Sequence, residues 1–117
     1  MSERDRNNIN AIIGSINKIE KFIVDIWDAD QLEQDELVLD ATLMNFVVIG
    51  ETSIKISSTF KLNHSDIDWR GIKDFRNFIA HDYFSVNVTE VWQIIKDHLP
   101  ILKSQLLNIL EVNKTDY

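Results

Sequence analysis

The sequence predicts an all-α fold, an antiparallel up-and-down bundle of four main helices that forms one domain over residues 1–117. Glycine and proline together account for 4 of the 117 residues, about 3% where average usage is ~12%, so few residues suit the tight turns of a β fold. Apolar residues recur at steps of three and four along most of the chain, which is the spacing of one helix face. Short polar connections then favour antiparallel neighbours.

The first predicted helix has an apolar stripe that begins at Ile9 and includes Trp27, and it stops in an acidic run near residues 28–30. Asp30 followed by Glu33 has the pattern of a capping box, which predicts a second helix over about 31–60. Its apolar residues cover more than half of the circumference, so we expect a central helix packed on several sides. They are Leu37, Leu39, Leu43, Met44, Phe46, Val47, Val48 and Ile49.

The third and fourth helices have clear start signals. Asp68 is the expected N-cap of a helix from 69 to about 80, because a short acidic side chain can accept a hydrogen bond from a free N–H of the first turn. Asn87, followed three residues later by an acid, predicts the start of the last helix in the same way. Pro100 removes a backbone donor inside that helix, so we expect a kink near Lys96.

Composition excludes several kinds of site. The chain has no cysteine, which rules out disulfides, thiolate zinc sites and thiol nucleophiles. His64, His81 and His98 lie too far apart in sequence for a closely spaced pair of metal ligands. We therefore expect neither a metal nor a cofactor. The longest uncharged stretch has eleven residues, 7–17, too few to span a membrane, and no apolar signal core follows the N-terminus. These features predict a cytoplasmic protein without membrane contact.

Charge is unevenly distributed along the chain. The net charge is −7, which disfavours broad, non-specific binding of nucleic acids. Residues 25–40, however, hold seven acids and no base, whereas residues 41–81 hold five bases and four acids. A polyanion can therefore still be bound at one local site. One interpretation of the acidic run is a solvated turn followed by a helix start. The other is a functional surface, which either repels RNA or binds a basic partner.

Chemically useful side chains concentrate in the third helix and its exit: Arg70, Lys73, Asp74, Arg76, Asn77, His81, Asp82 and Tyr83. Asp74, Asn77 and His81 fall close to one line on helical spacing. Arg grips phosphate oxygens with a permanently charged fork, and His titrates near neutral pH. Such residues suit cleavage of an RNA phosphodiester, with His moving the proton of the 2′-hydroxyl or the leaving oxygen and Arg holding the transition-state charge. The alternative is that they only cap the helix and form salt bridges.

The order of these residues is more specific than their types. Residues 76–83 read RNFIAHDY, which fits the pattern R-x4-H-x-Y with Asn directly after Arg. Residues 67–72, IDWRGI, are similar to an IPWR-x-I lead-in with Asp68 where proline is usual, and residues 48–51, VIGE, to an IGE element. In these features the chain resembles the HEPN superfamily and, within it, the HepT-like toxins. Asp74 and Phe75 depart from that pattern, which frequently has a small residue and Met there.

The resemblance implies a metal-independent endoribonuclease whose homodimer brings two R-x4-H motifs into one cleft. Arg76 and His81 are then catalytic, and Asn77 orients them or the phosphate. A 2′,3′-cyclic phosphate is the expected product. The hydroxyl of Tyr83 is the site at which a cognate nucleotidyltransferase, the antitoxin, places AMP to silence the toxin. Glu51 and Asp74 are further candidates for the site, although Glu51 can equally be a carboxylate that bonds a neighbouring Arg or a helix end.

Other interpretations stay open. The same bundle can serve as a non-catalytic substrate-binding or docking subunit of a nucleotidyltransferase, and Tyr83 can simply close the bundle with its ring. The tryptophans, Trp27, Trp69 and Trp92, are expected in the core because they fall on apolar stripes. His64 and His98 have no partner pattern and are expected to be structural or solvated.

Overall fold

Helices make up the regular structure of residues 1–114, the part of the chain that the computed structural model describes, and no strand occurs there. The all-α prediction is confirmed. The longer helices are α1 (Glu3–Phe22), α3 (Glu36–Ile54), α5 (Trp69–His81) and α7 (Leu99–Asn113). The shorter ones are α2 (Ala29–Gln34), α4 (Ser58–Asn63) and α6 (Val88–Gln93), with a 3₁₀ turn η1 (Tyr83–Ser85) and a π-helical turn η2 (Ile94–His98).

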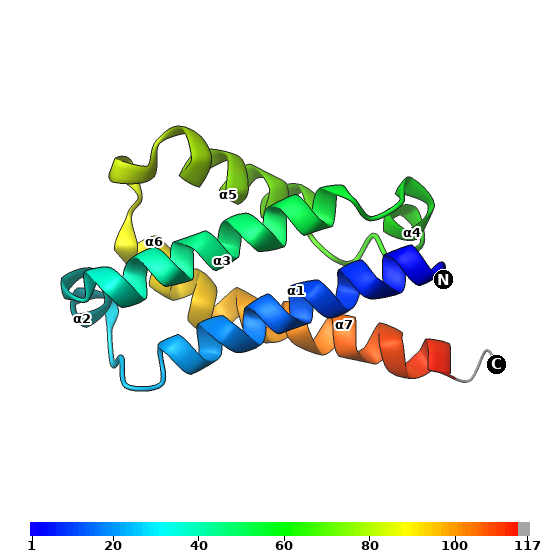
Figure 1. Cartoon of the computed structure of the whole chain (residues 1–117), viewed down its shortest axis with the longest axis horizontal. Helices are drawn as coiled ribbons and strands as arrows, with labels where there is room; N and C mark the ends of the chain where they lie inside the picture. Colours follow the sequence, from blue (N-terminus) through cyan, green and yellow to red (C-terminus); the bar gives the residue numbers. More distant parts are fainter. Residues whose placement is uncertain (115–117) are drawn as a thin grey trace.

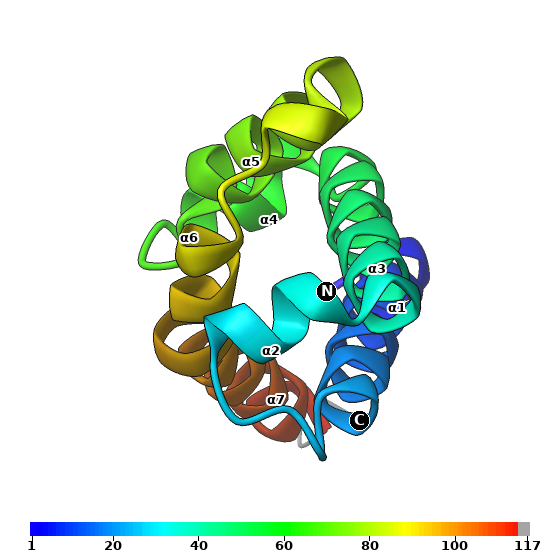
Figure 2. The same ribbon diagram turned by 90° about the vertical axis from the view of Figure 1, so that its left-hand side faces the viewer.

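The long helices run side by side along the molecule (Figure 1). Helix α3 packs against α1 and against α5, and α1 also packs against α7. Viewed along the bundle, α2 lies across one end, where it contacts α6 (Figure 2). By length and composition alone, α3 is long and apolar enough to cross a membrane. In the structure, α3 packs between α1 and α5.

Side-chain caps set most helix starts. Asp68 Oδ1 accepts the N–H of Gly71 at 3.0 Å and Asn87 Oδ1 accepts that of Glu90 at 3.1 Å, which confirms both predicted N-caps. The start predicted at Asp30 is wrong. Asp28 caps α2 instead, because its Oδ1 accepts the N–H of Gln31 at 2.9 Å.

The single helix predicted over 31–60 is three helices. Asp35 leaves helical geometry (φ −100°, ψ 86°) and caps α3 by accepting the N–H of Val38 at 3.1 Å. Ser57 caps α4 in the same way, with its Oγ accepting the N–H of Phe60 at 3.2 Å. Short polar side chains compete with the helix for backbone groups. Asp35 lies at the end of α2 and caps the start of α3, and Ser57 caps the start of α4.

The core is formed mainly by the apolar stripe of α1 and residues from every other long helix. Its fully enclosed side chains include Ile9, Ile12, Ile16, Ile19, Leu32, Val91 and Leu106, all 0% exposed. Helix α3 packs against α1, α2 and α5, in agreement with the expected central helix, but part of its apolar surface is uncovered: Leu37 and Met44 are 80% and 62% exposed. Trp27 is also exposed, since α1 ends at Phe22 and Trp27 lies in the loop beyond. Trp69 and Trp92 do pack against the core.

The predicted disturbance in the last helix takes the form of a π turn. Pro100 has no N–H to bond the carbonyl of Lys96, and Lys96 lies in the middle of η2. A π turn opens the helix by one residue at such a place, so the helical path from α6 continues into α7.

A buried carboxylate ties α1 to the start of α4. Asp5, 4% exposed, accepts hydrogen bonds from the backbone N–H of Ser57 at 2.9 Å and from its hydroxyl at 2.7 Å. Burial by itself raises the pKa of Asp5, but the hydrogen bonds from Ser57 and Ser2 and the charge of Arg4 together hold the pKa below the ordinary value of 3.8. Asp5 is therefore ionised in the folded protein at neutral pH.

Candidate active site

The R-x4-H motif occupies the last turns of α5. The helix begins at the Asp68 cap and ends at His81, and its one fully buried side chain, Ile79, anchors that end to the core. Because α5 packs along α3, motif side chains on the face of α5 that is turned toward α3 contact that helix. The site is therefore built from two helices that lie far apart in sequence.

Gly50 sets how closely these helices approach. A Cβ atom at this position would lie 2.2 Å from the Cβ of Arg76 and 2.5 Å from its Cγ, far inside van der Waals contact. The base of the Arg76 side chain thus occupies the space that any larger residue would fill. In the sequence, Gly50 belongs to the VIGE segment, and the structure shows it as a point of close approach between α3 and α5.

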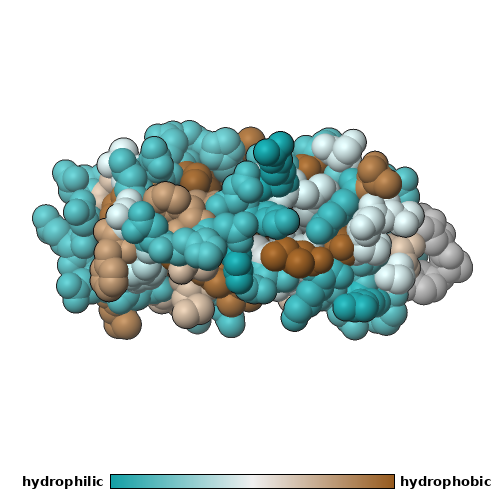
Figure 3. Space-filling model, turned by 90° about the horizontal axis from the view of Figure 1, so that it is seen from above, coloured by the Kyte–Doolittle hydropathy of each residue, from teal (hydrophilic) through white to brown (hydrophobic). Residues whose placement is uncertain are grey.

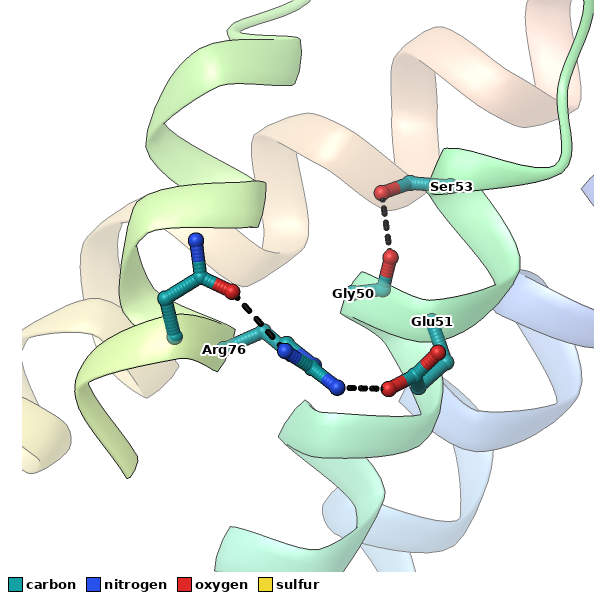
Figure 4. A network of polar contacts seen from close by, with 5 residues as sticks. Gly50, Glu51, Ser53 and Arg76 are labelled. Atoms are coloured by element: carbon teal, nitrogen blue, oxygen red, sulfur yellow. Dashed lines mark hydrogen bonds and ion pairs between the residues drawn. The ribbon is translucent and has the colours of Figure 1, made fainter. Parts of the chain in front are cut away.

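Arg76 is held by two partners (Figure 4). Its Nη2 forms an ion pair with Glu51 Oε1, and its Nη1 donates to Asn77 Oδ1 at 2.9 Å. The side chain of Arg76 is 26% exposed and that of Glu51 46%. The predicted alternative in which Glu51 bonds an arginine is confirmed, and that arginine belongs to the motif. Together the two partners orient a guanidinium whose outer edge still reaches solvent.

His81 and Asp74 lie outside this network. His81 is the last residue of α5 and is exposed, and no hydrogen bond or ion pair of its side chain is present in the described chain. Its imidazole is thus accessible to a substrate. Asp74 pairs with Arg70 at 3.8 Å on a solvated surface, where these side chains are 66% and 92% exposed. The structure therefore joins Asp74 to Arg70 and not to Arg76.

Tyr83 is bonded to a residue that sequence patterns do not indicate. Its hydroxyl donates to Asp40 Oδ1 on α3, 43 residues earlier in the chain. Burial, followed by this hydrogen bond and the charge of Asp40, raises the pKa of Tyr83 to about 12. Tyr83 remains 37% exposed, and the next residue, Phe84, is 98% exposed and meets its ring edge-on at 5.5 Å. Tyr83 therefore presents its hydroxyl near the surface.

Exposed apolar side chains lie beside the motif. Met44 and Val48 of α3 are 62% and 39% exposed, and Phe78 of α5 is 46% exposed. Met44, Val48 and Glu51 follow one another at steps of four and three, so they share a face of α3. That face therefore holds both uncovered apolar groups and the carboxylate that bonds Arg76. Seen from the α5 side, the surface is mixed, with hydrophobic groups between hydrophilic ones (Figure 3).

Two cavities of the described chain lie away from the motif. A cavity of about 360 Å³ lies between α3, α5, η2 and α7, and its lining includes Phe46, Ile72, Phe75 and Leu102. A second, of about 290 Å³, lies between the end of α1 and η2. Neither is lined by Arg76, Asn77 or His81. Within the motif, His81 is exposed, whereas Arg76 is only 26% exposed.

Comparison with known proteins places the chain in a family. The family model described as ribonuclease HepT-like matches residues 12–109. A "Probable ribonuclease HepT" of Thermococcus cleftensis is 31% identical over 90% of this chain and 94% of its own length. A "Putative RNase" of Methanocaldococcus jannaschii is 27% identical over 91% of this chain and 97% of its own length.

Another relative from M. jannaschii is longer. Named "Gamma-glutamylcyclotransferase and putative RNase", it is 27% identical over 88% of this chain, which spans 46% of that relative's length. No solved structure matches the chain significantly. The family and its relatives support a ribonuclease activity. The chain therefore belongs to the ribonuclease HepT-like family, as the motif predicted.

Proposed function

We propose that this protein is the toxin of a toxin–antitoxin pair, a cytoplasmic, metal-independent endoribonuclease that acts as a homodimer. The observation that carries the proposal is the arrangement at the end of α5. Arg76 is oriented by Glu51 and Asn77, and the exposed His81 follows at the helix end. An oriented cation and an accessible imidazole are the groups that cleavage of RNA by its own 2′-hydroxyl requires.

In the proposed reaction, one His81 takes the proton of the 2′-hydroxyl, whose oxygen attacks the adjacent phosphorus. The 5′-oxygen leaves and receives a proton from a second histidine, which yields a 2′,3′-cyclic phosphate. Arg76 stabilises the extra negative charge on the phosphoryl oxygens in the transition state. The side chains of this chain thus supply proton transfer and charge stabilisation.

A homodimer supplies the second histidine. A single chain offers one Arg76 and one His81 on an open surface, whereas a two-fold dimer places two of each in one cleft. The exposed apolar side chains on the Glu51 face of α3, Met44 and Val48, support an interface beside the motif. Sedimentation analysis at micromolar concentration is expected to give a dimer, and a monomer alone would contradict this part of the proposal.

Control is proposed to act through Tyr83. A cognate nucleotidyltransferase, the antitoxin, transfers AMP from ATP to its hydroxyl. The added phosphodiester is negatively charged and lies two residues from His81, so it competes for Arg76 and repels RNA. Mass spectrometry of the protein after incubation with partner and ATP is expected to locate AMP on Tyr83. Tyr83→Phe is expected to keep ribonuclease activity and escape inactivation.

The decisive experiment is RNA cleavage by the purified protein in the presence of a chelator. Arg76→Ala and His81→Ala are each expected to slow cleavage by about 10²-fold or more. Arg70→Ala and His98→Ala are matched controls, because both side chains are exposed and lie outside the Arg76 network. Equal cleavage by the Arg76 and His81 variants and the parent would refute the assignment.

The alternative is a non-catalytic substrate-binding or docking subunit of a nucleotidyltransferase. Such a subunit would bind its partner equally well as the parent, as Arg76→Ala or as His81→Ala, and none of the three would cleave RNA. The positioning of Arg76 by Glu51 and Asn77 favours the ribonuclease, because a docking surface has no need to orient the guanidinium that begins the motif.

A further inference from the structure

The bond between Tyr83 and Asp40 has a chemical consequence. We propose that Asp40 is the proton acceptor for adenylyl transfer to Tyr83, so that the toxin itself supplies the base for its own silencing. This inference rests on the proposed function, because it concerns how AMP reaches Tyr83. It adds a residue on α3 that neither the motif nor the family comparison indicates.

The geometry of the contact is the first argument. The Tyr83 hydroxyl already donates its hydrogen to Asp40 Oδ1, so the acceptor lies on the bond that must break. General bases act within hydrogen-bond reach of the proton that they remove. Both residues are partly exposed, so the contact lies at the surface, where a nucleotide would approach.

The electrostatics around Tyr83 supply the second argument. Asp40 on α3 is the charged group that acts on Tyr83. The other charged or titratable groups on the neighbouring elements are Glu36 and Glu51 on α3, Arg70, Lys73, Asp74, Arg76 and His81 on α5, and Asp82 between His81 and Tyr83. Burial and the charge of Asp40 raise the pKa of Tyr83 to about 12, so a free phenolate is scarce at neutral pH. Attack by the hydroxyl therefore needs a base that removes the proton as the new bond forms, and Asp40 is in place to do so.

The Tyr83 oxygen attacks the α-phosphorus of ATP while its proton passes to the Asp40 carboxylate. The bond between the α-phosphorus and the bridging oxygen breaks, and pyrophosphate leaves. The products are a tyrosyl–AMP phosphodiester and a protonated Asp40, which returns its proton to water. No oxidation or reduction takes part.

Asp40 both accepts the hydrogen bond of the Tyr83 hydroxyl and, in this proposal, takes up its proton, and Asp40→Asn separates these two roles. The amide keeps the size of the side chain and an oxygen that accepts the hydroxyl hydrogen, but it does not take up a proton at neutral pH. Glu36→Gln is the matched control, because Glu36 lies one turn earlier on the same helix, is exposed, and loses the same charge. Thermal unfolding of all three proteins verifies that each is folded.

The test is the rate of AMP incorporation into Tyr83 with the cognate nucleotidyltransferase and ATP, measured by mass spectrometry across a range of pH. The Asp40→Asn variant is expected to be modified about 10²-fold more slowly at neutral pH, and Glu36→Gln at the parental rate. The rate of the Asn variant should also rise about tenfold per pH unit, because phenolate then becomes the nucleophile. The parental rate should stay nearly level over the same range.

The outcomes are distinguishable. Modification of Asp40→Asn at the parental rate, with the parental pH profile, would overturn the role of Asp40 while leaving AMP transfer to Tyr83 intact. Absence of AMP on Tyr83 in the parent would overturn the proposed control and this inference together. A slower Asn variant with a level pH profile would also overturn it, because loss of positioning alone does not change the protonation dependence.

Discussion

Replacing Gly50 with alanine tests whether the approach of α3 to α5 builds the site. The added Cβ would lie 2.2 Å from the Cβ of Arg76, whereas carbon atoms in contact normally lie about 3.5–4.0 Å apart. The two helices would therefore have to separate by about 1.3 Å or more. The clash involves a Cβ fixed to the backbone of α5, so rotation of the Arg76 side chain does not relieve it.

Two opposing free energies set the expected magnitude. Alanine in a helix interior is favoured over glycine by about 1 kcal/mol. Overpacking of a close contact destabilises by about 1–3 kcal/mol and occasionally more, and this contact lies near the upper end because neither partner can withdraw. We expect a net loss of about 2 kcal/mol in the free energy of unfolding. Displacement of Arg76 by about 1 Å should slow RNA cleavage about 10²-fold.

Gly14→Ala is the matched control. Gly14 lies inside α1, and a Cβ there would meet nothing within 4 Å, so this variant should gain about 1 kcal/mol from helix propensity and cleave RNA normally. Urea unfolding of parent and both variants measures the stabilities, and initial rates of RNA cleavage measure the activities. A Gly50→Ala protein as stable and as active as Gly14→Ala would refute the reasoning.

The remaining predictions concern an acid, an ion pair and an exposed ring. Asp5→Asn should lower the free energy of unfolding at pH 7 by about 1.5–3 kcal/mol. Because the pKa of Asp5 is lowered in the folded state, its stabilisation is present above the unfolded pKa of about 3.8 and is lost as the pH falls through the folded pKa. The free energy of unfolding of the variant should therefore fall less steeply than that of the parent as the pH is lowered. Glu51→Ala should change the free energy of unfolding by less than about 1 kcal/mol, since the ion pair with Arg76 is partly exposed. It should nevertheless slow RNA cleavage about 10- to 100-fold, because the guanidinium is no longer held in place. An unchanged kcat would show that Glu51 does not position Arg76. Trp27→Ala should change stability by no more than about 0.5 kcal/mol because Trp27 is 84% exposed, and a larger loss in thermal unfolding would place it in a contact.

Local signals in the sequence account for the all-α class and for the boundaries of α5. The scarcity of glycine and proline, the apolar periodicity and the Asp68 and Asn87 caps all act within one or two helical turns. Such interactions depend on residues close in the chain, so they can be read without a structure. The error over 31–60 arose because apolar residues continue through this segment, although Asp35 and Ser57 cap the starts of new helices there.

The motif itself, from Arg76 to Tyr83, and the family that it indicates were likewise predictable from the order of residues, and the family comparison confirms the latter. The roles of Arg76, Asn77, His81 and Tyr83 in the reaction and its control stay predictions that the proposed experiments test.

Only the tertiary structure decided which groups meet these residues. Glu51 lies 25 positions before Arg76 and Asp40 lies 43 before Tyr83, and no local pattern specifies contacts over such separations. They follow from the crossing of α3 and α5, which Gly50 permits by the absence of a side chain. The exposure of Trp27 was decided in the same way, by where α1 ends relative to the packed core. Sequence periodicity determines which face of a helix is apolar, but the packing of distant helices determines which part of that face is covered.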